Sequence, residues 1–150
     1  IYRNPFDVAL SLQERELKRG EKFKIDWKKK LKERFLIRGF QYQESYRIKN
    51  ENEGVELWKT YLQSIESLKQ ELPSEQYLEF KYEHFTSEPL SALQEIALYL
   101  SLDISGHKLN QIVSSVHQDS QHKYLNSAKG LALFDRYKKD ELIIKYQYHK

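Results

Sequence analysis

The sequence predicts an α/β fold that is predominantly helical and contains a short parallel sheet. Several segments repeat apolar residues at the spacing of an amphipathic helix, whereas residues 77–82 alternate with period two, as a half-buried strand does. Ile1 and Tyr2 are expected to end another strand just before the first helix. Because a long helical stretch separates the two strands, they need a crossover connection. We therefore expect them to lie parallel in one sheet, with helices packed against it.

The first helix is expected to begin at Pro5. Asn4 is a good N-cap residue, and Pro5 suits the first helical position because its fixed φ matches the helix and it has no N–H to leave unbonded. The helix then continues through an apolar run into a charged stretch. Four residues form that run: Val8, Ala9, Leu10 and Leu12.

The charged stretch, residues 14–38, is strongly basic. It holds eleven Lys or Arg and five Asp or Glu, a net charge of +6, in a chain whose net charge is +3. One interpretation is a solvated helix with ion pairs four residues apart, such as Glu14 with Lys18. A second is an electropositive face that attracts an anionic acceptor or a membrane surface. No known nucleic-acid-binding module is visible, so we expect no nucleic-acid partner.

The middle of the chain is expected to form a loop, a helix and the strand. Residues 47–54 are polar and are expected to be the loop. A helix follows, with Trp58 on its apolar face, and Pro73 stops it because Pro cannot continue a helix. The stripe around Trp58 has the spacing of a core-facing helix and predicts burial.

The remainder is expected to be three further helices. One follows Pro89, with its apolar face ending at Leu100, and a second follows Gly106. Residues 117–131 are rich in Ser, Gln, Asn and Gly and are expected to be a loop. Residues 133–148 are expected to form the last helix.

The composition excludes several classes of protein. There is no Cys, so disulfides and Cys-based zinc sites are excluded, which disfavours a secreted protein and favours the cytoplasm. No apolar run approaches the roughly 18–20 residues of a membrane span, and no signal peptide is present. The five His residues show no metal-binding spacing, so we expect no metal site. The chain begins with Ile1 and contains no Met, so we expect a piece of a longer protein.

The start of the first helix carries most of the functional information. Arg3 stands directly before a helix N-terminus, where N–H groups and the positive end of the helix dipole favour a bound phosphate. The planar fork of Arg matches phosphate oxygens. Ser11 follows Asn4 by seven residues, two helical turns, so its hydroxyl shares a face with the cap. The alternative is that Arg3 binds a carboxylate and Ser11 is only solvated.

This segment resembles the 3′-phosphate-binding segment of the sulfotransferase family. Its Arg-Asn-Pro-Phe-Asp-Val-Ala-Leu-Ser run keeps that family's spacing of eight residues from Arg3 to Ser11. Residues 80–102 are similar to the family's strand-then-helix segment, with Tyr82 at the position of a tyrosine near the nucleotide. The order and spacing of the two segments agree with the family, which strengthens the resemblance.

A third resemblance lies near the end of the chain. Lys129 and Gly130 stand where the family has an Arg-Lys-Gly loop over the 3′-phosphate. Ala128 replaces the Arg of that loop, so this chain departs from the family pattern there.

The resemblance implies that residues 1–150 are the C-terminal part of a P-loop-like sulfotransferase domain. Such a domain transfers a sulfuryl group from 3′-phosphoadenosine 5′-phosphosulfate (PAPS) to a hydroxyl or amine acceptor, with Arg3 and Ser11 on the 3′-phosphate. The phosphosulfate loop and the catalytic base, usually His or Glu, would lie upstream. No catalytic residue is therefore assigned, and the chain is expected to be inactive alone. The rival hypothesis is a non-catalytic helical interaction domain that binds an acidic partner through residues 14–38.

Overall fold

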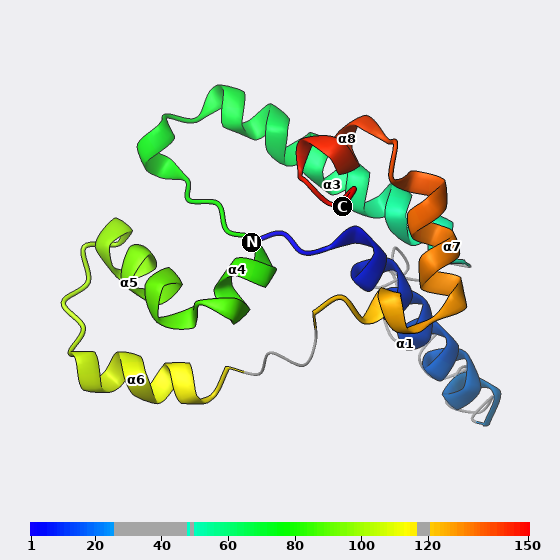
Figure 1. The fold of residues 1–150 in the computed structure, drawn as a ribbon, viewed down its shortest axis with the longest axis horizontal. Helices are drawn as coiled ribbons and strands as arrows, with labels where there is room; N and C mark the ends of the chain where they lie inside the picture. Colours follow the sequence, from blue (N-terminus) through cyan, green and yellow to red (C-terminus); the bar gives the residue numbers. More distant parts are fainter. Residues whose placement is uncertain (26–47, 49, 117–120) are drawn as a thin grey trace, which may run out of the picture. The chain divides into compact units, whose positions relative to one another are not determined.

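The computed structural model describes most of the chain as helix (Figure 1). The described residues are 1–25, 48, 50–116 and 121–150. The chain divides into two compact units, the first comprising residues 1–4 and 61–123 and the second comprising residues 5–60 and 124–150. Helix α3 (Glu51–Glu71) begins in the second unit and ends in the first. The prediction of a predominantly helical chain is confirmed.

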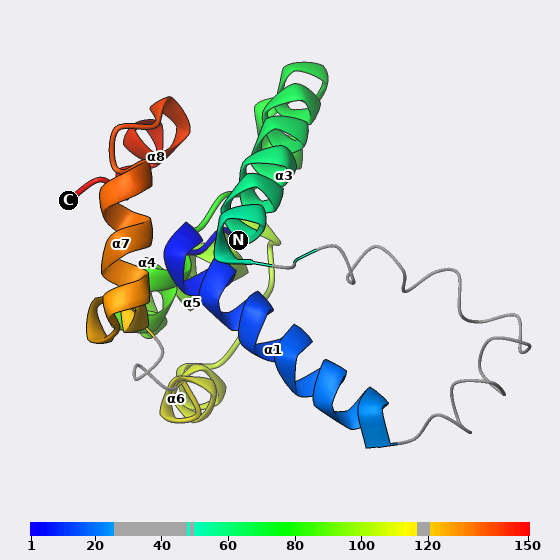
Figure 2. The same cartoon turned by 90° about the vertical axis from the view of Figure 1, so that its right-hand side faces the viewer.

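The second unit is built around the contact between α1 (Pro5–Ile25) and α7 (Ala128–Tyr137). Figure 2 shows the two helices side by side. Three aromatic rings form the core of the unit, those of Phe6, Tyr124 and Phe134, whose centroids lie 5.2 to 5.9 Å apart. Ring pairs at these separations add to the stabilisation that their burial supplies.

Helix α3 brings a second aromatic cluster and a close helix contact to the second unit. Trp58 is buried, as predicted, and its ring meets those of Tyr146 and Tyr148 edge-on at 6.0 and 6.1 Å. Gly54 allows the backbone of α3 to approach α1, because a Cβ at Gly54 would lie only 2.8 Å from the Cα of Ala9. Since that distance is too short for any side chain, the position requires glycine.

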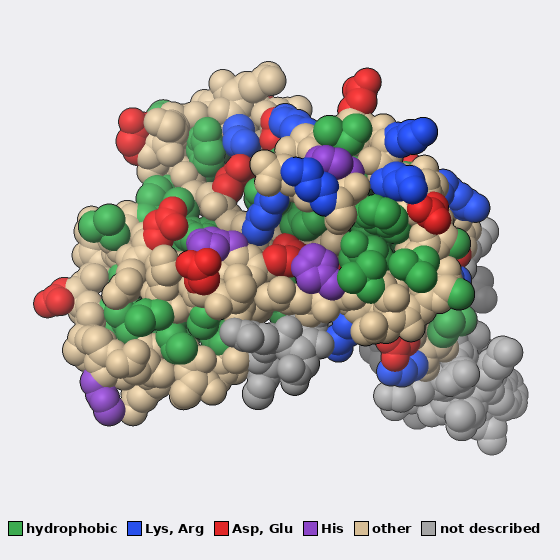
Figure 3. All heavy atoms as spheres, viewed as in Figure 1, with side chains coloured by type: hydrophobic (Ala, Val, Ile, Leu, Met, Phe, Trp, Pro, Cys, Tyr) green, Lys and Arg blue, Asp and Glu red, His purple; other side chains and the backbone are tan. Residues whose placement is uncertain are grey.

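The first unit contains three short helices in sequence, α4 (Tyr82–Ser87), α5 (Pro89–Tyr99) and α6 (Gly106–Ser114). Helix α5 packs against both α4 and α6. The expected helices after Pro89 and Gly106 are thus confirmed, but the apolar face of α5 is buried only in part. Ala92 and Ala97 are buried, whereas Leu100, where the expected apolar face ends, is 54% exposed. Figure 3 shows hydrophobic side chains at the surface over α5 and α6.

The expected short parallel sheet is not formed among the residues that the structure describes. Residues 77–80 are extended, and one isolated bridge joins Tyr2 to Lys81 in the parallel direction. A 3₁₀ turn (Ser74–Gln76) precedes the extended segment. Helix α4 begins at Tyr82, so the backbone turns into a helix one residue after the bridge and the pairing ends there.

The bounds of three segments predicted from the sequence were wrong. The loop expected at residues 47–54 ends early, because α3 begins at Glu51. Asn50 caps that helix: its Oδ1 accepts the backbone N–H groups of Asn52 and Glu53 at 3.0 and 3.1 Å. A side-chain acceptor at this position satisfies N–H groups that have no partner inside the helix, so the helix can begin before its first apolar residue.

The single helix expected at residues 133–148 is two helices, α7 and α8 (Glu141–Lys145). Asp140 separates them because its carboxylate accepts the N–H of Leu142 at 3.0 Å and caps α8. The loop expected at residues 117–131 is also shorter than predicted. Of this range, residues 117–120 lie outside the described residues, a 3₁₀ turn covers Lys123–Asn126, and α7 begins at Ala128.

Candidate functional site

Residues 2–4 lie beside residues 81–83 in the first unit, each residue opposite the one 79 positions later. The first pair, Tyr2 with Lys81, is the parallel backbone bridge. Tyr2 donates its N–H to the carbonyl of Phe80 at 2.9 Å, and Tyr82 donates its N–H to the carbonyl of Tyr2 at 2.7 Å. The backbone before α1 is therefore held against the start of α4.

The second pair brings together two of the predicted site residues, Arg3 and Tyr82. The guanidinium carbon of Arg3 lies 4.6 Å from the centre of the Tyr82 ring, within the range of a cation–π contact. Such a contact uses the face of the guanidinium, whereas its N–H groups lie in the plane of the group. Arg3 can therefore be held by the ring and still donate hydrogen bonds to an anion.

The third pair joins Asn4 to Glu83. Asn4 is almost fully buried, with 1% of its surface exposed, and its N–H donates to Oε1 of Glu83 at 2.8 Å. The side-chain amide of Gln121 donates to the carbonyl of Glu83 at 3.1 Å and to the hydroxyl of Thr86, which is itself buried. Glu83, whose carboxylate accepts the N–H of Asn4, therefore belongs to a backbone segment that other hydrogen bonds also hold.

Helix α1 begins at Pro5, directly after this segment, as predicted. Asp7 lies in its first turn, where a negative charge is favoured by the helix dipole. The Asp7 side chain is buried and its Oδ1 accepts the N–H of Tyr124 at 2.9 Å. Within the second unit, Asp7 therefore joins the start of α1 to the turn before α7.

The other predicted site residues, Ser11, Lys129 and Gly130, belong to the second unit. Ser11 is exposed on α1. Lys129 and Gly130 lie in the first turn of α7 and not in a loop. Since Arg3 belongs to the first unit, a joint role of these residues at one phosphate stays a prediction.

Lys129 is held between α1 and α3. Its ammonium nitrogen lies 2.7 Å from Oε1 of Gln13 and 3.1 Å from Oε2 of Glu51. A backbone hydrogen bond and the hydrogen bond from Lys129 lower the pKa of the Glu51 carboxyl, against the opposing effect of partial burial. Glu51 therefore stays ionised at neutral pH and competes with any other anion for Lys129.

Gly130 is buried where α7 meets the preceding turn. A Cβ at Gly130 would lie 2.1 Å from the carbonyl oxygen of Tyr124. Its N–H donates to Oγ of Ser127, the N-cap of α7, at 2.9 Å. These contacts give Gly130 a packing role that the sequence resemblance does not imply.

Sequence reasoning did not assign roles to Glu83, Gln13 or Glu51. A role of Glu83 follows from its place next to Tyr82 once the pairing is known. If Arg3 faces Tyr82 in a parallel pairing, the next residue, Asn4, faces Glu83. Gln13 and Glu51 carry no comparable signal, since their contact with Lys129 depends on how three helices pack.

The basic stretch is described only in part. Its residues 14–25 lie in α1, and residues 26–38 lie outside the described residues. The expected ion pair between Glu14 and Lys18 is present at 2.5 Å. Binding of an acidic partner through this stretch stays a hypothesis.

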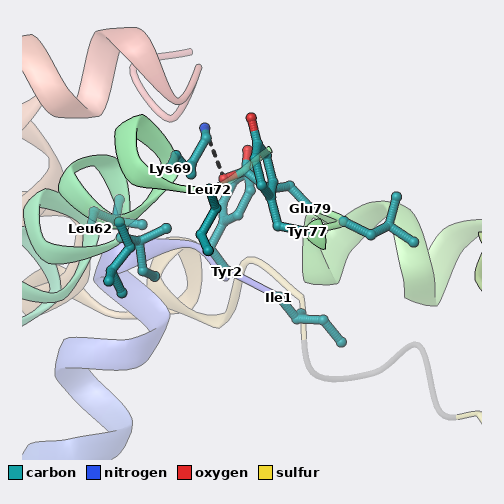
Figure 4. A pocket seen from close by; sticks show the side chains of 10 residues that line it. Ile1, Tyr2, Leu62, Lys69, Leu72, Tyr77 and Glu79 are labelled. Carbon is teal, nitrogen blue, oxygen red and sulfur yellow. Dashed lines mark ion pairs between the residues drawn. The ribbon is translucent and has the colours of Figure 1, made fainter. Parts of the chain in front are cut away.

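An apolar pocket of about 220 Å³ lies in the first unit (Figure 4). Ile1, Tyr2, the second half of α3 and the extended segment line it. Lys69 and Glu79 form an ion pair of 3.0 Å at this pocket, and burial together with the charge of Glu79 raises the pKa of the Tyr2 hydroxyl. The pocket can accept an apolar group beside one charged pair.

A metal site and a membrane span are both absent from the residues that the structure describes. They contain no group of three or more His, Cys, Asp or Glu side chains placed to hold a metal ion. None of their helices combines the length and the apolar character needed to cross a membrane.

Comparison with known proteins identifies one family. A family model described as "Sulfotransferase domain" matches residues 1–138. No curated protein and no solved structure matches the chain. The family match covers most of the chain, including Arg3, Ser11, Tyr82, Lys129 and Gly130.

Proposed function

Because the chain belongs to the sulfotransferase family, we propose that it works in the transfer of a sulfuryl group from PAPS to a hydroxyl or amine acceptor and holds the 3′-phosphate of the donor. The domain would be the C-terminal part of a P-loop-like sulfotransferase domain. The proposed acceptors include anionic molecules, which the basic stretch at residues 14–38 would attract.

The stacking of Arg3 on Tyr82 is the observation that supports the proposal most. Arg3 carries a permanent positive charge and stands, in the sequence, two residues before a 21-residue helix. A phosphate there gains charge-assisted hydrogen bonds from Arg3 and a favourable interaction with the helix dipole. A tyrosine that carries the arginine also offers an aromatic surface beside the phosphate.

The chemistry that PAPS supplies is a sulfur atom bonded to a good leaving group. An acceptor oxygen or nitrogen attacks the sulfur, the bond to the nucleotide phosphate breaks, and a base takes the acceptor's proton. Arg3 and Ser11 act at the 3′-phosphate, so their part is to position the donor. Lys129 and Gly130 are included in the proposed nucleotide site, with Lys129 available only if it exchanges Glu51 for the phosphate.

The proposal includes inactivity of the 150 residues alone. The five glycines are Gly20, Gly39, Gly54, Gly106 and Gly130, and none of them belongs to a glycine-rich phosphate loop. We assign no residue of the chain as the catalytic base. A cytoplasmic location, suggested by the absence of Cys, stays part of the proposal.

The proposal is tested by calorimetric titration with 3′,5′-adenosine bisphosphate, the product that PAPS leaves behind. Arg3→Ala is expected to weaken binding by about 2–5 kcal/mol, the scale for removing one side of a buried charged pair. Arg3→Lys should recover part of the loss, because it restores the charge without the planar fork.

Arg136→Ala is the matched control. Arg136 lies in α7, where its Nη1 donates to Oδ1 of Asn52 at 2.6 Å, so it has no part in the Arg3 segment. Its replacement should leave nucleotide affinity unchanged. Equal affinity of the Arg3→Ala variant and the unmodified protein would refute the assignment of Arg3.

A further inference from the structure

We propose that Glu83 is a positioning residue for the 3′-phosphate site, because its carboxylate holds the N–H of Asn4 and thereby sets the direction in which Arg3 is presented. This inference rests on the proposed function. Its physical basis is the third pair of the register, in which Oε1 of Glu83 lies 2.8 Å from the backbone nitrogen of Asn4.

The bond acts on a backbone that has little freedom left. The Asn4 N–H belongs to the same peptide plane as the carbonyl of Arg3, so fixing the N–H fixes that plane. Pro5 follows, and a residue before Pro is restricted to extended conformations. Because Tyr82 holds the other end of the same residue by its side chain, Arg3 is held at its guanidinium and at its peptide plane.

Burial makes the bond hard to replace. Asn4 is 1% exposed, and a buried N–H that loses its acceptor costs the full desolvation of the group unless water or another acceptor reaches it. Glu83 is itself held in the first turn of α4, where its carbonyl accepts from Gln121 at 3.1 Å and from Oγ1 of Thr86 at 3.2 Å. The acceptor is thus in place before any ligand binds.

Charge and position predict opposite effects of removing Glu83. A carboxylate near an anion-binding arginine repels a phosphate, so an effect of charge alone predicts tighter nucleotide binding when the carboxylate is removed. Positioning predicts weaker binding, because the Arg3–Asn4 plane loses its anchor. Glu83→Gln removes the charge and keeps an oxygen acceptor, whereas Glu83→Ala removes both. The two variants therefore separate the two effects.

The test measures two quantities on the whole chain: hydrogen exchange of the Asn4 amide by NMR, and calorimetric affinity for 3′,5′-adenosine bisphosphate. Glu83→Ala should speed Asn4 exchange about tenfold or more and weaken nucleotide binding about tenfold, the scale of one hydrogen bond to a charged group. Glu83→Gln should keep the Asn4 exchange rate and the nucleotide affinity within about twofold of the unmodified protein, or should bind the nucleotide slightly more tightly. Glu95→Ala, at an exposed position of α5, is the control and should change neither.

Each of the following results would contradict the inference. Nucleotide binding as tight in Glu83→Ala as in the unmodified protein would overturn the positioning role and leave the proposed function intact. Equal weakening in Glu83→Gln and Glu83→Ala would also contradict the inference, because Gln keeps an oxygen acceptor for the Asn4 N–H and should preserve nucleotide binding. No nucleotide binding by the unmodified protein would overturn the proposed function and this inference with it.

Discussion

Replacement of Gly130 by Ala distinguishes a packing role of this residue from a role in a phosphate loop. The structure places Gly130 in the first turn of α7, buried against the turn that carries Tyr124. An added Cβ would lie 2.1 Å from the carbonyl oxygen of Tyr124 and 2.7 Å from its carbonyl carbon and Cα. All three are backbone atoms, so no side-chain rotation can relieve the contact.

The expected cost follows from two opposing effects. Overpacking that forces a backbone shift costs about 1–3 kcal/mol, and occasionally more. We expect a cost at the upper end of this range because the contact is very close. The rings of Phe6 and Phe134 also pack on Tyr124 and oppose a shift of its backbone. Alanine gains about 1 kcal/mol over glycine in helix propensity. We expect a net loss of about 2 kcal/mol in the free energy of unfolding, or about 4–8 °C in Tm.

Urea denaturation followed by circular dichroism measures the change. Gly106→Ala is the matched control, because an added Cβ there has no atom within 4 Å and Gly106, like Gly130, lies in the first turn of a helix. It should be neutral or stabilising by up to about 1 kcal/mol. Gly130→Ala variants as stable as the unmodified protein, with lost nucleotide affinity, would refute the packing argument and favour the loop role.

Two further predictions concern the cap of α8 and the hydroxyl on α1. Asp140→Ala should lower the free energy of unfolding by about 1–2 kcal/mol, since it removes the cap and the 2.7 Å ion pair with Lys59. Burial raises the pKa of the Asp140 carboxyl, but hydrogen bonds from Lys59 and from the N–H of Leu142 outweigh burial, so that this pKa is lowered. The hydrogen bond to Asp140 in turn raises the pKa of Lys59. The difference in free energy of unfolding between the variant and the unmodified protein, measured by urea denaturation, should therefore be largest between about pH 4 and pH 10. It should shrink as pH falls through the lowered pKa of Asp140 or rises through the raised pKa of Lys59. A difference independent of pH would exclude a contribution of the ion pair. Ser11→Ala should weaken calorimetric binding of 3′,5′-adenosine bisphosphate by about 1 kcal/mol without changing stability, and unchanged affinity would remove Ser11 from the site.

Helix positions followed from local patterns, whereas their ends depended on single polar side chains. The apolar stripes predicted the helices around Trp58, after Pro89 and after Gly106, because a buried face must repeat at helical spacing. The start of α3 was missed because Gly54 in a polar run suggested a loop. In the structure Gly54 serves a close contact with Ala9, and the cap at Asn50 begins the helix.

Asp140 shows the same limit at the other end of the chain. The apolar pattern continues across it, so the sequence predicted one helix where its capping carboxylate begins a new one. The strand at residues 77–82 was predicted from alternation alone. Alternation does not show that Tyr82 starts α4, which shortens the pairing with Tyr2 to one bridge.

The sequence supplied candidate residues for the site only where they belong to a motif. Arg3 and Tyr82 were both assigned to the nucleotide site from the family resemblance, and the structure brings them within 4.6 Å. Glu83 was missed because its role depends on a register between segments 79 residues apart, which neither propensity nor local spacing encodes. Lys129 was assigned, together with Gly130, from the resemblance to the family's Arg-Lys-Gly loop. No local pattern indicates that Glu51 pairs with Lys129.

Selectivity for the 3′-phosphate tests the central claim most directly. Calorimetric titrations of the protein with 3′,5′-adenosine bisphosphate and with adenosine 5′-monophosphate compare two ligands that differ only in that phosphate. If Arg3, held on Tyr82 before α1, binds the 3′-phosphate, the bisphosphate should bind at least about 30-fold more tightly, equivalent to about 2 kcal/mol. Equal dissociation constants for the two nucleotides would contradict the assignment of this segment as a 3′-phosphate site.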